Sequence, residues 1–337
     1  MKAARYHRGE TRLRVEEAEK PRAQEGEVLV RVRAAGVCHT DLHFLEGSMK
    51  SPEVITLGHE IAGEVAEVGE SVAGNRVGER VLVNNCAGCG NCESCREGRG
   101  NLCDNLVQIG FNADGGYAEY VRVRADCALP LGGISFEEGA ALTCGAASCY
   151  HALMDVAGLR LGDVVLVNGT GGLGFSALQI AKLAGATTIA VDVVQPKLDL
   201  AIREYGADHA VNGSKADVPG EVVKITGGRG VDVHLELVGI SKTMGYGISA
   251  LSKRGRMVLV GHTNDEFVAS PISMIKKEAR VLSSVAYRAS DLVAVRDLTA
   301  SGRLRPLIAQ RNRLDQINEA LQELRGGKVM GRSVIAF

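Results

Sequence analysis

Residues 164–174 read VVLVNGTGGLG, and this stretch decides the fold of the second half of the chain. Its first five residues form an apolar run of the kind found in buried parallel strands. Gly169, Gly171 and Gly174 then fit the pattern G-x-G-x-x-G, and a helical pattern follows at once over Leu173–Ala184. A glycine-rich turn between a strand and a helix is the arrangement that binds a dinucleotide. The stretch therefore predicts a doubly wound α/β domain with a dinucleotide site.

Each glycine of this turn has a separate task in that interpretation. Gly169 makes the tight turn, Gly171 lets the backbone approach a pyrophosphate, and Gly174 allows close packing of helix and strand. Gly172 and Leu173 lie at the N-terminus of the predicted helix, where unpaired N–H groups and the positive end of the helix dipole suit phosphates. With 42 glycines in the chain, a plain glycine-rich turn is the alternative. The flanking strand and helix favour the dinucleotide site.

An acidic residue follows at the distance that a dinucleotide site requires. Asp192 ends a second apolar strand, Thr187–Asp192, eighteen residues after Gly174. A carboxylate there can accept hydrogen bonds from both hydroxyls of an adenine ribose, and it repels a 2′-phosphate. The sequence therefore predicts NAD rather than NADP, and a merely solvated Asp is the alternative.

The alternation of strands and helices continues beyond this site. Proline and glycine bound a predicted helix from Pro196 to Gly206, and strand-like runs follow at 231–238 and 256–260. Such alternation implies a doubly wound parallel sheet. Helical patterns occupy 291–324, and a short strand ends the chain.

Residues 1–145 have a different character, because short runs with alternating apolar positions lie between glycines. This pattern predicts a β-rich, barrel-like domain, and 337 residues are enough for two domains. The clearest predicted strands are Val28–Val32, Ile61–Val68, Arg80–Val83 and Tyr117–Val123.

The composition fits a globular enzyme, with 45% hydrophobic and 23% charged residues. A formal net charge of -1 gives no electrostatic reason to expect nucleic acid or an anionic membrane as a partner. The basic N-terminus is not followed by the apolar stretch of a signal peptide. No run approaches the roughly 18 apolar residues of a membrane span. We therefore expect a cytoplasmic protein whose partner is a small molecule.

Five of the nine cysteines are concentrated in one loop. Cys89, Cys92, Cys95 and Cys103 form C-x2-C-x2-C-x7-C, which suits a closed tetrahedral zinc site. Disulfides are disfavoured in the cytoplasm. Cys86 extends the spacing backward, so an iron–sulfur cluster held by the first four of these five cysteines is an alternative. The proline that commonly follows such a run is absent.

A second, sparser set of residues suits a catalytic zinc, which needs three protein ligands and one open position. Cys38 opens the run CHTDLH at 38–43, His59 is followed by Glu60, and Cys144 stands near the start of the α/β half. Two thiolates and an imidazole would balance the charge of the ion. Singly, a cysteine can be a small buried hydrophobe and a His–Glu pair can lie on the surface. Spacing alone does not bring these residues together.

Together these residues resemble the medium-chain, zinc-dependent alcohol dehydrogenase family over essentially the whole chain. The resemblance implies a GroES-like catalytic domain at 1–147 and 286–337, and a Rossmann NAD-binding domain at 148–285. It also implies a homodimer or homotetramer. The matching segments, in chain order, are Gly36–Asp41 with His43, Gly58–Gly63, the four-cysteine loop, Cys144, Gly169–Gly174, and Asp192 with Lys197.

The resemblance also implies the ligands of the catalytic zinc. Cys38, His59 and Cys144 would bind it, with Glu60 as a nearby or alternating fourth ligand. Asp41 would orient His59 through its free ring nitrogen.

A structural zinc would lie in the loop, bound by Cys89, Cys92, Cys95 and Cys103, and Cys86 would be the extra cysteine. On the cofactor side, Lys197 would approach the adenosine ribose and Arg332 would help to hold the pyrophosphate. His39 stands where some relatives carry Arg, so its phosphate contact would be weaker and pH-sensitive.

The implied reaction uses zinc as a Lewis acid that lowers the pKa of a bound alcohol, so that hydride can pass to the nicotinamide. Thr40 would hydrogen-bond the alcohol oxygen and pass its proton through a ribose hydroxyl to His43; a surface histidine is the alternative. Asn85 and Cys86 are expected to face the substrate pocket and make it more polar than usual. Residues 283–288 lack a glycine expected near the return to the first domain.

Other enzymes of the superfamily are the nearest alternatives. A polyol or amino-alcohol dehydrogenase is one, although the polyol branch is expected to carry a carboxylate in place of Cys144. Zinc-free reductases of this fold lack the cysteine and histidine ligands. A zinc-ribbon module for nucleic acid would need a basic loop, and this loop offers only Arg96 and Arg99. The particular alcohol is not predicted.

Overall fold

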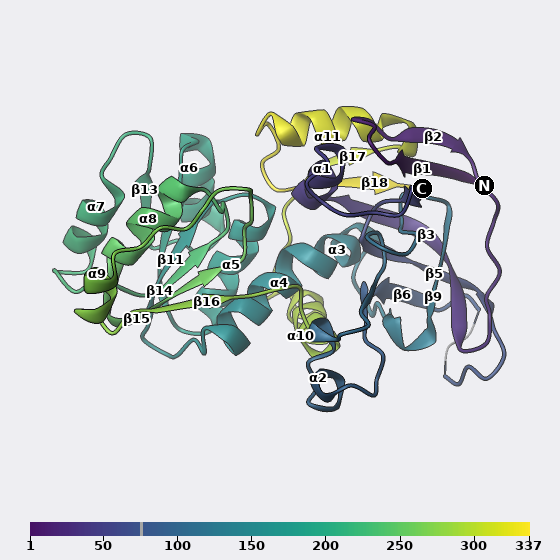
Figure 1. The fold of residues 1–337 in the computed structure, drawn as a ribbon, viewed down its shortest axis with the longest axis horizontal. Coiled ribbons are helices and arrows are strands. Elements are labelled where there is room, and N and C mark those ends of the chain that lie inside the picture. Colours follow the sequence, from purple (N-terminus) through teal and green to yellow (C-terminus); the bar gives the residue numbers. More distant parts are fainter. Residues whose placement is uncertain (75–76) are drawn as a thin grey trace. The chain divides into compact units, whose positions relative to one another are not determined.

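Two sheets of different kinds organise the molecule, a computed structural model that describes residues 1–74 and 77–337. One compact unit comprises residues 1–147 and 286–337, and the other comprises residues 148–285. Figure 1 shows both chain termini in the first unit. The first unit is dominated by antiparallel strands and the second by a parallel sheet with helices, so the predicted fold class is confirmed.

The second unit contains a six-stranded sheet in the order β13-β12-β11-β14-β15-β16, with every neighbouring pair parallel. The strand order reverses between β11 and β14. In open α/β sheets, ligands bind outside the carboxyl ends of the strands at such a reversal. The strands are β11 Val164–Asn168, β12 Thr187–Asp192, β13 His209–Asn212, β14 Val231–Glu236, β15 Leu251–Leu259 and β16 Arg280–Ser283.

Helices join these strands and cover the sheet (Figure 1). The apolar core includes Leu166, Ile189 and Met257 from the strands, all fully buried. The predicted helix to Gly206 ends earlier, at Glu204, because Gly206 adopts a φ of 79° in the left-handed region. The helices are α5 Gly172–Leu183, α6 Gln195–Glu204, α7 Val218–Ile225, α8 Ser241–Ala250 and α9 Pro271–Ile275.

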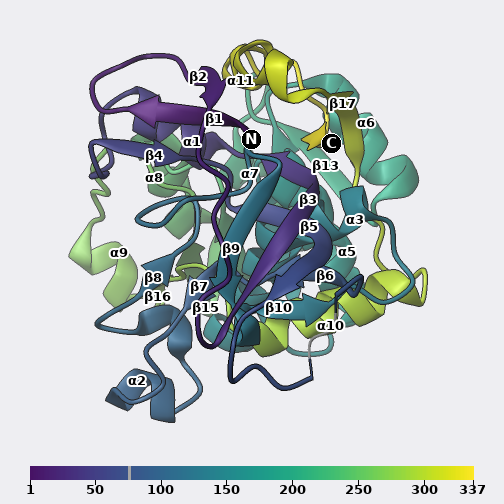
Figure 2. The ribbon, with the colours of Figure 1, turned by 90° about the vertical axis from the view of Figure 1, so that its right-hand side faces the viewer.

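The first unit is built on a seven-stranded sheet in the order β10-β6-β5-β3-β18-β17, with β9 also paired to β3. Figure 2 shows β3, β5, β6, β9 and β10 side by side. The C-terminal strand β18 pairs with β3, so strands from both ends of the chain belong to this sheet. The strands are β3 Glu27–Val37, β5 Glu60–Val68, β6 Arg80–Val83, β9 Tyr120–Arg124, β10 Ala128–Pro130, β17 Ile308–Asn312 and β18 Arg332–Ala336.

Two smaller sheets and several helices complete the first unit. Its core cluster draws Leu42 and Phe44 from α1 and Leu321 from α11, together with strand residues. The remaining elements are β1 Lys2–His7, β2 Arg14–Glu17, β4 Val54–Thr56, β7 Cys86–Ala87, β8 Val107–Gln108, α1 His39–Leu45, α2 Glu93–Arg96, α10 Ala289–Ala300 and α11 Ile317–Arg325. None of the helices in the described ranges is both long and apolar enough to cross a membrane.

The interpretation of residues 1–145 as strands misses the helices α1, α2 and α3. Helix α3, Phe136–Ala141, begins after Ser135, whose side chain accepts the N–H of Glu138, while the Glu138 carboxylate accepts the N–H of Ser135. This reciprocal pair is the capping box S-x-x-E, a signal present in the sequence. A π-helical turn, Leu142–Ala146, follows directly and contains Cys144, and α4, Ala147–Tyr150, continues the chain. Such turns often occur at functional sites.

The chain returns to the first unit at Ala286. Its φ of 51° lies in the left-handed region, which a residue with a Cβ occupies at a cost of about 1–2 kcal/mol. The absence of glycine from 283–288 therefore leaves an alanine in a conformation that favours glycine.

Candidate metal centres and dinucleotide site

Four potential metal ligands converge in the first unit from three segments far apart in sequence. Cys38 caps α1 directly after β3, His59 and Glu60 stand at the start of β5, and Cys144 lies in the π-helical turn. One ligand atom from each residue lies within 4.8 Å of every other. Strand pairing places Gly36 opposite Glu60, and a Cβ on Gly36 would lie 1.9 Å from Glu60 Oε2. Glycine at this position therefore leaves the space that the carboxylate occupies.

The chemistry of this cluster fits zinc. Two thiols, one imidazole and one carboxylate form a donor set typical of catalytic zinc, and Cys38, His59 and Glu60 are buried. The hydrogen bond with Cys144 holds the pKa of the Cys38 thiol well below its usual range, against the effect of burial. Burial raises the pKa of Glu60 to about 7, although Arg332 opposes this shift. A divalent cation would compensate the buried negative charge.

Asp41 and Tyr117 form a buried layer behind His59. The Asp41 Oδ2 atom accepts the N–H of Cys38 at 3.0 Å and the hydroxyl of Tyr117 at 2.7 Å. Its Oδ1 atom lies 3.5 Å from His59 Nδ1, and neither of these two atoms has another hydrogen-bond partner within the described chain. With Nδ1 facing Asp41, the His59 Nε2 atom faces the cluster, 3.9 Å from Glu60 Oε1. This arrangement suits a metal ligand oriented by a carboxylate.

Arg332 lies at the start of β18 and forms a buried ion pair with Glu60. Its Nε donates to Glu60 Oε2 at 2.9 Å, and its Nη2 donates to Oε1. The Arg332 side chain is 6% exposed and the Glu60 side chain is fully buried. Sequence reasoning predicted a pyrophosphate contact for Arg332 and did not foresee this pair. The pairing follows from the sheet, where β3 lies between β5 and β18.

The residues expected to relay protons lie on α1, next to the cluster. Thr40 Oγ1 is 3.6 Å from Cys38 Sγ, and both Thr40 and His43 are partly exposed. They are three residues apart, so the helix places them on the same side. His39 is exposed at the first position of the helix.

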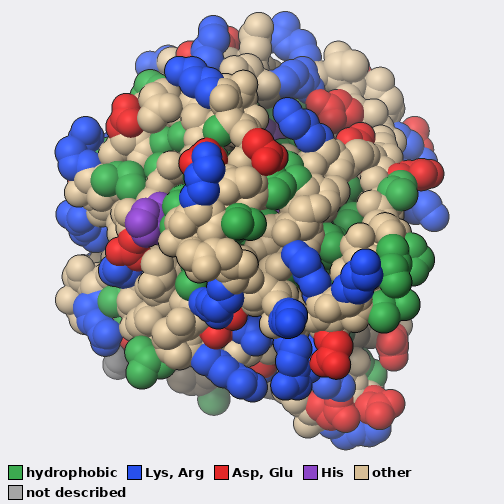
Figure 3. Space-filling model, turned by 90° about the vertical axis from the view of Figure 1, so that its left-hand side faces the viewer, with side chains coloured by type: hydrophobic (Ala, Val, Ile, Leu, Met, Phe, Trp, Pro, Cys, Tyr) green, Lys and Arg blue, Asp and Glu red, His purple; other side chains and the backbone are tan. Residues whose placement is uncertain are grey.

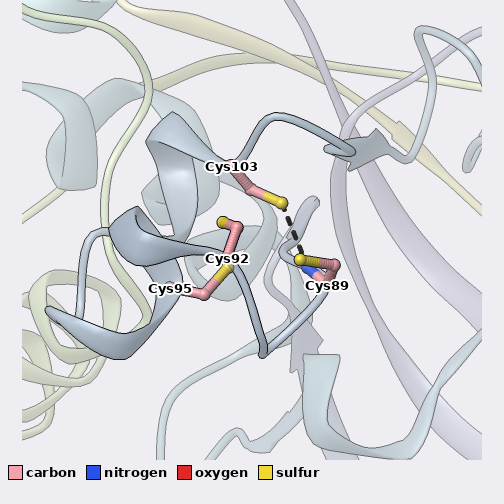
Figure 4. Close-up of side chains that lie close together, drawn as sticks. All are labelled: Cys89, Cys92, Cys95 and Cys103. Carbon is pink, nitrogen blue, oxygen red and sulfur yellow. Dashed lines mark hydrogen bonds between the residues drawn. The ribbon is translucent and has the colours of Figure 1, made fainter.

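The second cluster lies in the loop around α2, which projects from the sheet of the first unit (Figures 1 and 2). Figure 4 shows the side chains of Cys89, Cys92, Cys95 and Cys103 pointing toward a common centre. Their sulfur atoms lie within 4.8 Å of one another. Four cysteines in this arrangement fit a structural zinc.

Backbone N–H groups favour the thiolate form of two cysteines of this cluster, Cys89 and Cys92. Cys103 Sγ accepts the N–H of Cys89 at 3.2 Å and that of Asn105 at 3.3 Å. N–H groups of Asn91 and Cys92 lower the pKa of Cys89 to about 6. Hydrogen bonds to the charged form of a group lower its pKa in this way, and zinc binds thiolates.

Cys86 stands outside both clusters. It is a buried thiol in β7, and burial raises its pKa to about 11. Its Sγ lies 3.5 Å from Asn85 Oδ1. An iron–sulfur cluster that uses Cys86 as a ligand therefore does not fit the geometry.

Sequence reasoning did not single out Tyr287. Its side chain is buried, and its hydroxyl lacks a hydrogen-bond partner in the described chain. Burial raises the pKa of this hydroxyl.

The glycine turn of the second unit has the shape of an anion-binding loop. Gly169 adopts a φ of 98°, and a Cβ on Gly174 would lie 2.0 Å from the carbonyl oxygen of Gly169. A Cβ on Gly171 would meet nothing within 4 Å, so that face of the turn is open. Helix α5 has no side-chain cap at its N-terminus. Its first N–H groups, including those of Gly172 and Leu173, are therefore suited to phosphate.

Asp192 lies beside this turn at the end of β12. Its Oδ2 accepts the N–H and hydroxyl of Thr170 at 2.8 and 2.9 Å, and its Oδ1 accepts the N–H groups of Val193 and Val194. The carboxylate is thus fixed by the second residue of the turn. Lys197 lies in the first turn of α6 and is buried.

Comparisons with known proteins agree with both units. Residues 24–133 match the family model of the alcohol dehydrogenase GroES-like domain, and residues 172–301 match that of the zinc-binding dehydrogenase. An NAD-dependent alcohol dehydrogenase from Sulfurisphaera tokodaii is 35% identical over 334 residues, which is 96% of each chain.

Solved structures give the same result. The alcohol dehydrogenase of Aeropyrum pernix superposes with a TM-score of 0.94 at 36% identity, covering 100% of both chains. A thermostable alcohol dehydrogenase from Pyrobaculum aerophilum, solved with cobalt and zinc bound, gives a TM-score of 0.90 at 31% identity, covering 100% of this chain and 99% of the other.

A GroES-like unit with two metal-ligand clusters, combined with a Rossmann unit, defines the class of medium-chain dehydrogenases. The chain belongs to the zinc-dependent alcohol dehydrogenase family of that class.

Proposed function

We propose that the protein transfers a hydride between an alcohol and NAD, giving an aldehyde or ketone, with one catalytic and one structural zinc per chain. The observation that carries this proposal is the convergence of Cys38, His59, Glu60 and Cys144 within 4.8 Å of one another. The open glycine turn and the fixed Asp192 carboxylate support the NAD site. The relative from Sulfurisphaera tokodaii is named an NAD-dependent alcohol dehydrogenase, which supports the proposal.

The chain's own residues prepare the metal site. Cys38, His59 and Cys144 hold the catalytic zinc, which supplies a Lewis acid for the substrate oxygen. Asp41 fixes the ring of His59 from behind, where their facing atoms lie 3.5 Å apart. Glu60, which forms an ion pair with Arg332, would be a nearby or alternating fourth ligand of the zinc. Cys89, Cys92, Cys95 and Cys103 hold the structural zinc.

The proton of the alcohol needs a route outward, and α1 provides one. Thr40 accepts the alcohol proton next to Cys38, from which it is separated by 3.6 Å. His43, which is partly exposed, would take up the proton that the Thr40 hydroxyl passes on and release it to water. Histidine exchanges protons with water near neutral pH.

Replacing Thr40 by valine tests this route. The valine keeps the shape but removes the hydroxyl, and we expect kcat/KM for the alcohol to fall about 100-fold, the lower range of general acid–base effects. Steady-state kinetics of Thr40→Val against Thr56→Val, a control in β4, measures the effect. Unchanged kcat/KM for Thr40→Val would exclude Thr40 from the proton route.

On the cofactor side, the first N–H groups of α5 bind the pyrophosphate and Asp192 binds the adenine ribose. Lys197 approaches the same ribose, and His39 adds a pH-sensitive phosphate contact. Arg332, whose Nε and Nη2 donate to Glu60, is the further residue that we expect to help hold the pyrophosphate.

Asp192 provides a test of cofactor choice. Changing Asp192 to serine removes the charged acceptor and the repulsion of a 2′-phosphate. We expect kcat/KM for NAD to fall about 10- to 100-fold, because hydrogen bonds to charged groups contribute about 1.5–3 kcal/mol, while activity with NADP rises. The control Asp199→Ser changes an exposed carboxylate of α6. An unchanged NADP-to-NAD ratio of kcat/KM in Asp192→Ser would contradict the assignment.

Assembly and location belong to the same proposal. Strand β16 lies at the edge of its sheet with only β15 as a partner, and unpaired edges favour pairing with another chain. Nearby, Val268, Ile272 and Ile275 are exposed, and Figure 3 shows hydrophobic side chains between charged ones on this side of the molecule. We therefore expect a homodimer or homotetramer.

The nine cysteines form no disulfide with one another. Free thiols are typical of the reducing cytoplasm, which is the location that we expect.

The test of the proposed function is NADH formation by the zinc-replete protein with primary, secondary and aromatic alcohols, with NADP assayed in parallel. We expect turnover with NAD for at least one class and little with NADP. The order of the rates identifies the substrate class. Turnover with polyols or amino alcohols alone would indicate a specialised enzyme of the superfamily, and no turnover with any alcohol would contradict the proposal.

A further inference from the structure

A group of polar side chains is buried beneath the glycine turn of the second unit. Asn168 ends β11 and Glu236 ends β14, the two strands between which the strand order reverses. Asn168 is 2% exposed, and Glu236 and its neighbour His234 are fully buried. Tyr246 approaches them from α8. Buried polar groups of this kind require hydrogen-bond partners.

The Glu236 carboxylate joins two loops. Its Oε1 accepts the N–H groups of Val238 and Gly239, both at 2.8 Å, and the hydroxyl of Thr243 at 3.1 Å. Its Oε2 accepts the side-chain amide of Asn168 at 2.8 Å. One carboxylate thus holds both the loop after β14 and the residue that precedes the glycine turn.

Asn168 connects the Glu236 carboxylate to the glycine turn at 169–174. Its Oδ1 accepts the hydroxyl of Tyr246 at 2.5 Å, so both ends of the amide are fixed. Gly169 follows directly, and a Cβ there would lie 3.0 Å from Val238 Cγ2. The glycine turn and the loop after β14 are therefore in contact as well as tied to the same carboxylate.

Glu236 is suited to this role as an ionised group. Burial raises its pKa, but His234, whose Nε2 lies 3.4 Å from Glu236 Oε2, and the N–H groups of Gly239 and Val238 together bring the pKa below the ordinary value. A charged acceptor makes stronger hydrogen bonds than a neutral one. Proton binding to Glu236 is therefore confined to acidic pH.

We propose that Glu236 is a positioning residue for the dinucleotide, which acts through Asn168 on the glycine turn and through Val238 and Gly239 on the neighbouring loop. It fixes both loops at the reversal of the sheet in the geometry that receives the pyrophosphate. This inference rests on the proposed use of NAD, and it assigns a function to a buried network that the metal chemistry does not use.

Exchanging the amide of residue 168 and the carboxylate of residue 236 distinguishes a role in positioning the dinucleotide from a role in the stability of the fold. In Asn168→Asp, a second carboxylate faces Glu236, and the two repel each other until one of them takes up a proton at lower pH. In the double variant Asn168→Asp/Glu236→Gln, the glutamine amide donates to the new carboxylate. Its Oε1 still accepts the loop N–H groups, and Tyr246 still donates to residue 168. The swap reverses the polarity of the hydrogen bond between residues 168 and 236 and keeps those from the loop N–H groups, Thr243 and Tyr246. The contact that it changes besides is that of His234 Nε2 with Oε2 of residue 236.

The experiment is calorimetric titration of zinc-replete wild type and variants with NAD, together with kcat and KM for NAD. We expect Asn168→Asp to raise the Kd for NAD at least about tenfold, which is 1.4 kcal/mol, with less than about twofold change in kcat at saturating NAD. The double variant is expected to recover a Kd within about threefold of wild type.

The pH dependence gives a second signature. In Asn168→Asp, lowering the pH adds the shared proton, which restores a hydrogen bond between the two carboxyl groups, so NAD affinity is expected to improve. The charged and titratable groups around the pair are His234 on β14, Tyr246 on α8 and Asp192 on β12. All three remain in the double variant, whose NAD affinity is expected to depend on pH as in wild type.

Each outcome decides the inference. Wild type that does not bind NAD would overturn the proposed function together with this inference. Wild type that binds NAD, with Asn168→Asp folded and binding equally well, would overturn this inference alone. If Asn168→Asp does not fold, Tyr246→Phe decides. This variant removes only the hydroxyl on Asn168, and a Kd raised about threefold supports the inference whereas an unchanged Kd overturns it.

Discussion

Replacing Cys144 by alanine is expected to abolish alcohol oxidation while leaving the fold intact. The change removes one of two thiolates from a cluster whose ligand atoms lie within 4.8 Å of one another. A Lewis acid contributes several kcal/mol to such a reaction, and each 1.36 kcal/mol is tenfold in rate. We therefore expect kcat/KM to fall by about 1000-fold or more, with zinc content reduced from two to one per chain. Steady-state kinetics and metal analysis of the purified variant measure both effects.

The matched control is Cys127→Ala. Cys127 is buried, and it belongs to neither metal-ligand cluster of the described chain. We expect this variant to keep two zinc ions and most of its activity. Equal loss of zinc and activity in both variants would show that Cys144 has no special role.

The second large effect concerns stability. Changing Arg332 to methionine leaves the Glu60 carboxylate without its guanidinium partner in a fully buried position. Removing one member of a buried ion pair costs about 3–5 kcal/mol, because the remaining charge is uncompensated. We expect a loss of this size in the free energy of unfolding at a pH well above 7, where Glu60 is ionised, measured by urea denaturation of the protein without bound zinc, because a bound zinc would compensate the charge. The double variant with Glu60→Gln should recover a large part of the loss, because no charge is left buried.

Arg33 and Glu64 offer the comparison within the same sheet. Their Nη2 and Oε2 atoms lie 2.7 Å apart, but the side chains are 29% and 31% exposed. An ion pair of this kind contributes about 0–1 kcal/mol, so Arg33→Met is expected to have little effect. Equal losses for Arg332→Met and Arg33→Met would contradict a special contribution from burial.

The parts of the fold that follow from local patterns were accessible from sequence. Strands β11 and β12 have the predicted bounds, because an apolar run bounded by a glycine turn leaves little freedom. Zinc and NAD as cofactors also agree with the family matches. Helix α3 was missed although its capping box is present, since the glycine-rich surroundings suggested only strands and turns.

The assembly of the catalytic cluster could not be derived from spacing. Cys38, His59 and Cys144 meet because β3 pairs with β5 and because α3 leads into a π-helical turn. Both are long-range features. The Arg332–Glu60 pair was missed for the same reason, since it joins β18 to β5 across β3.

The network around Glu236 shows a different limit of sequence reasoning. In the sequence, Asn168 looks like an ordinary strand end and Glu236 lies within the predicted strand-like run 231–238. Their hydrogen bond at 2.8 Å arises from the parallel pairing of β11 with β14, where the two residues are opposite each other. The register of a parallel pair is not encoded in either strand alone.

The central claim, direct hydride transfer between alcohol and NAD, is tested most directly with isotope. The alcohol that turns over fastest is supplied with deuterium at its carbinol carbon, and the NADH formed is analysed by mass spectrometry. We predict one deuterium in each NADH for each carbonyl product, because the hydrogen moves from carbon to carbon without exchange. NADH free of deuterium, with the label in the solvent, would contradict the account.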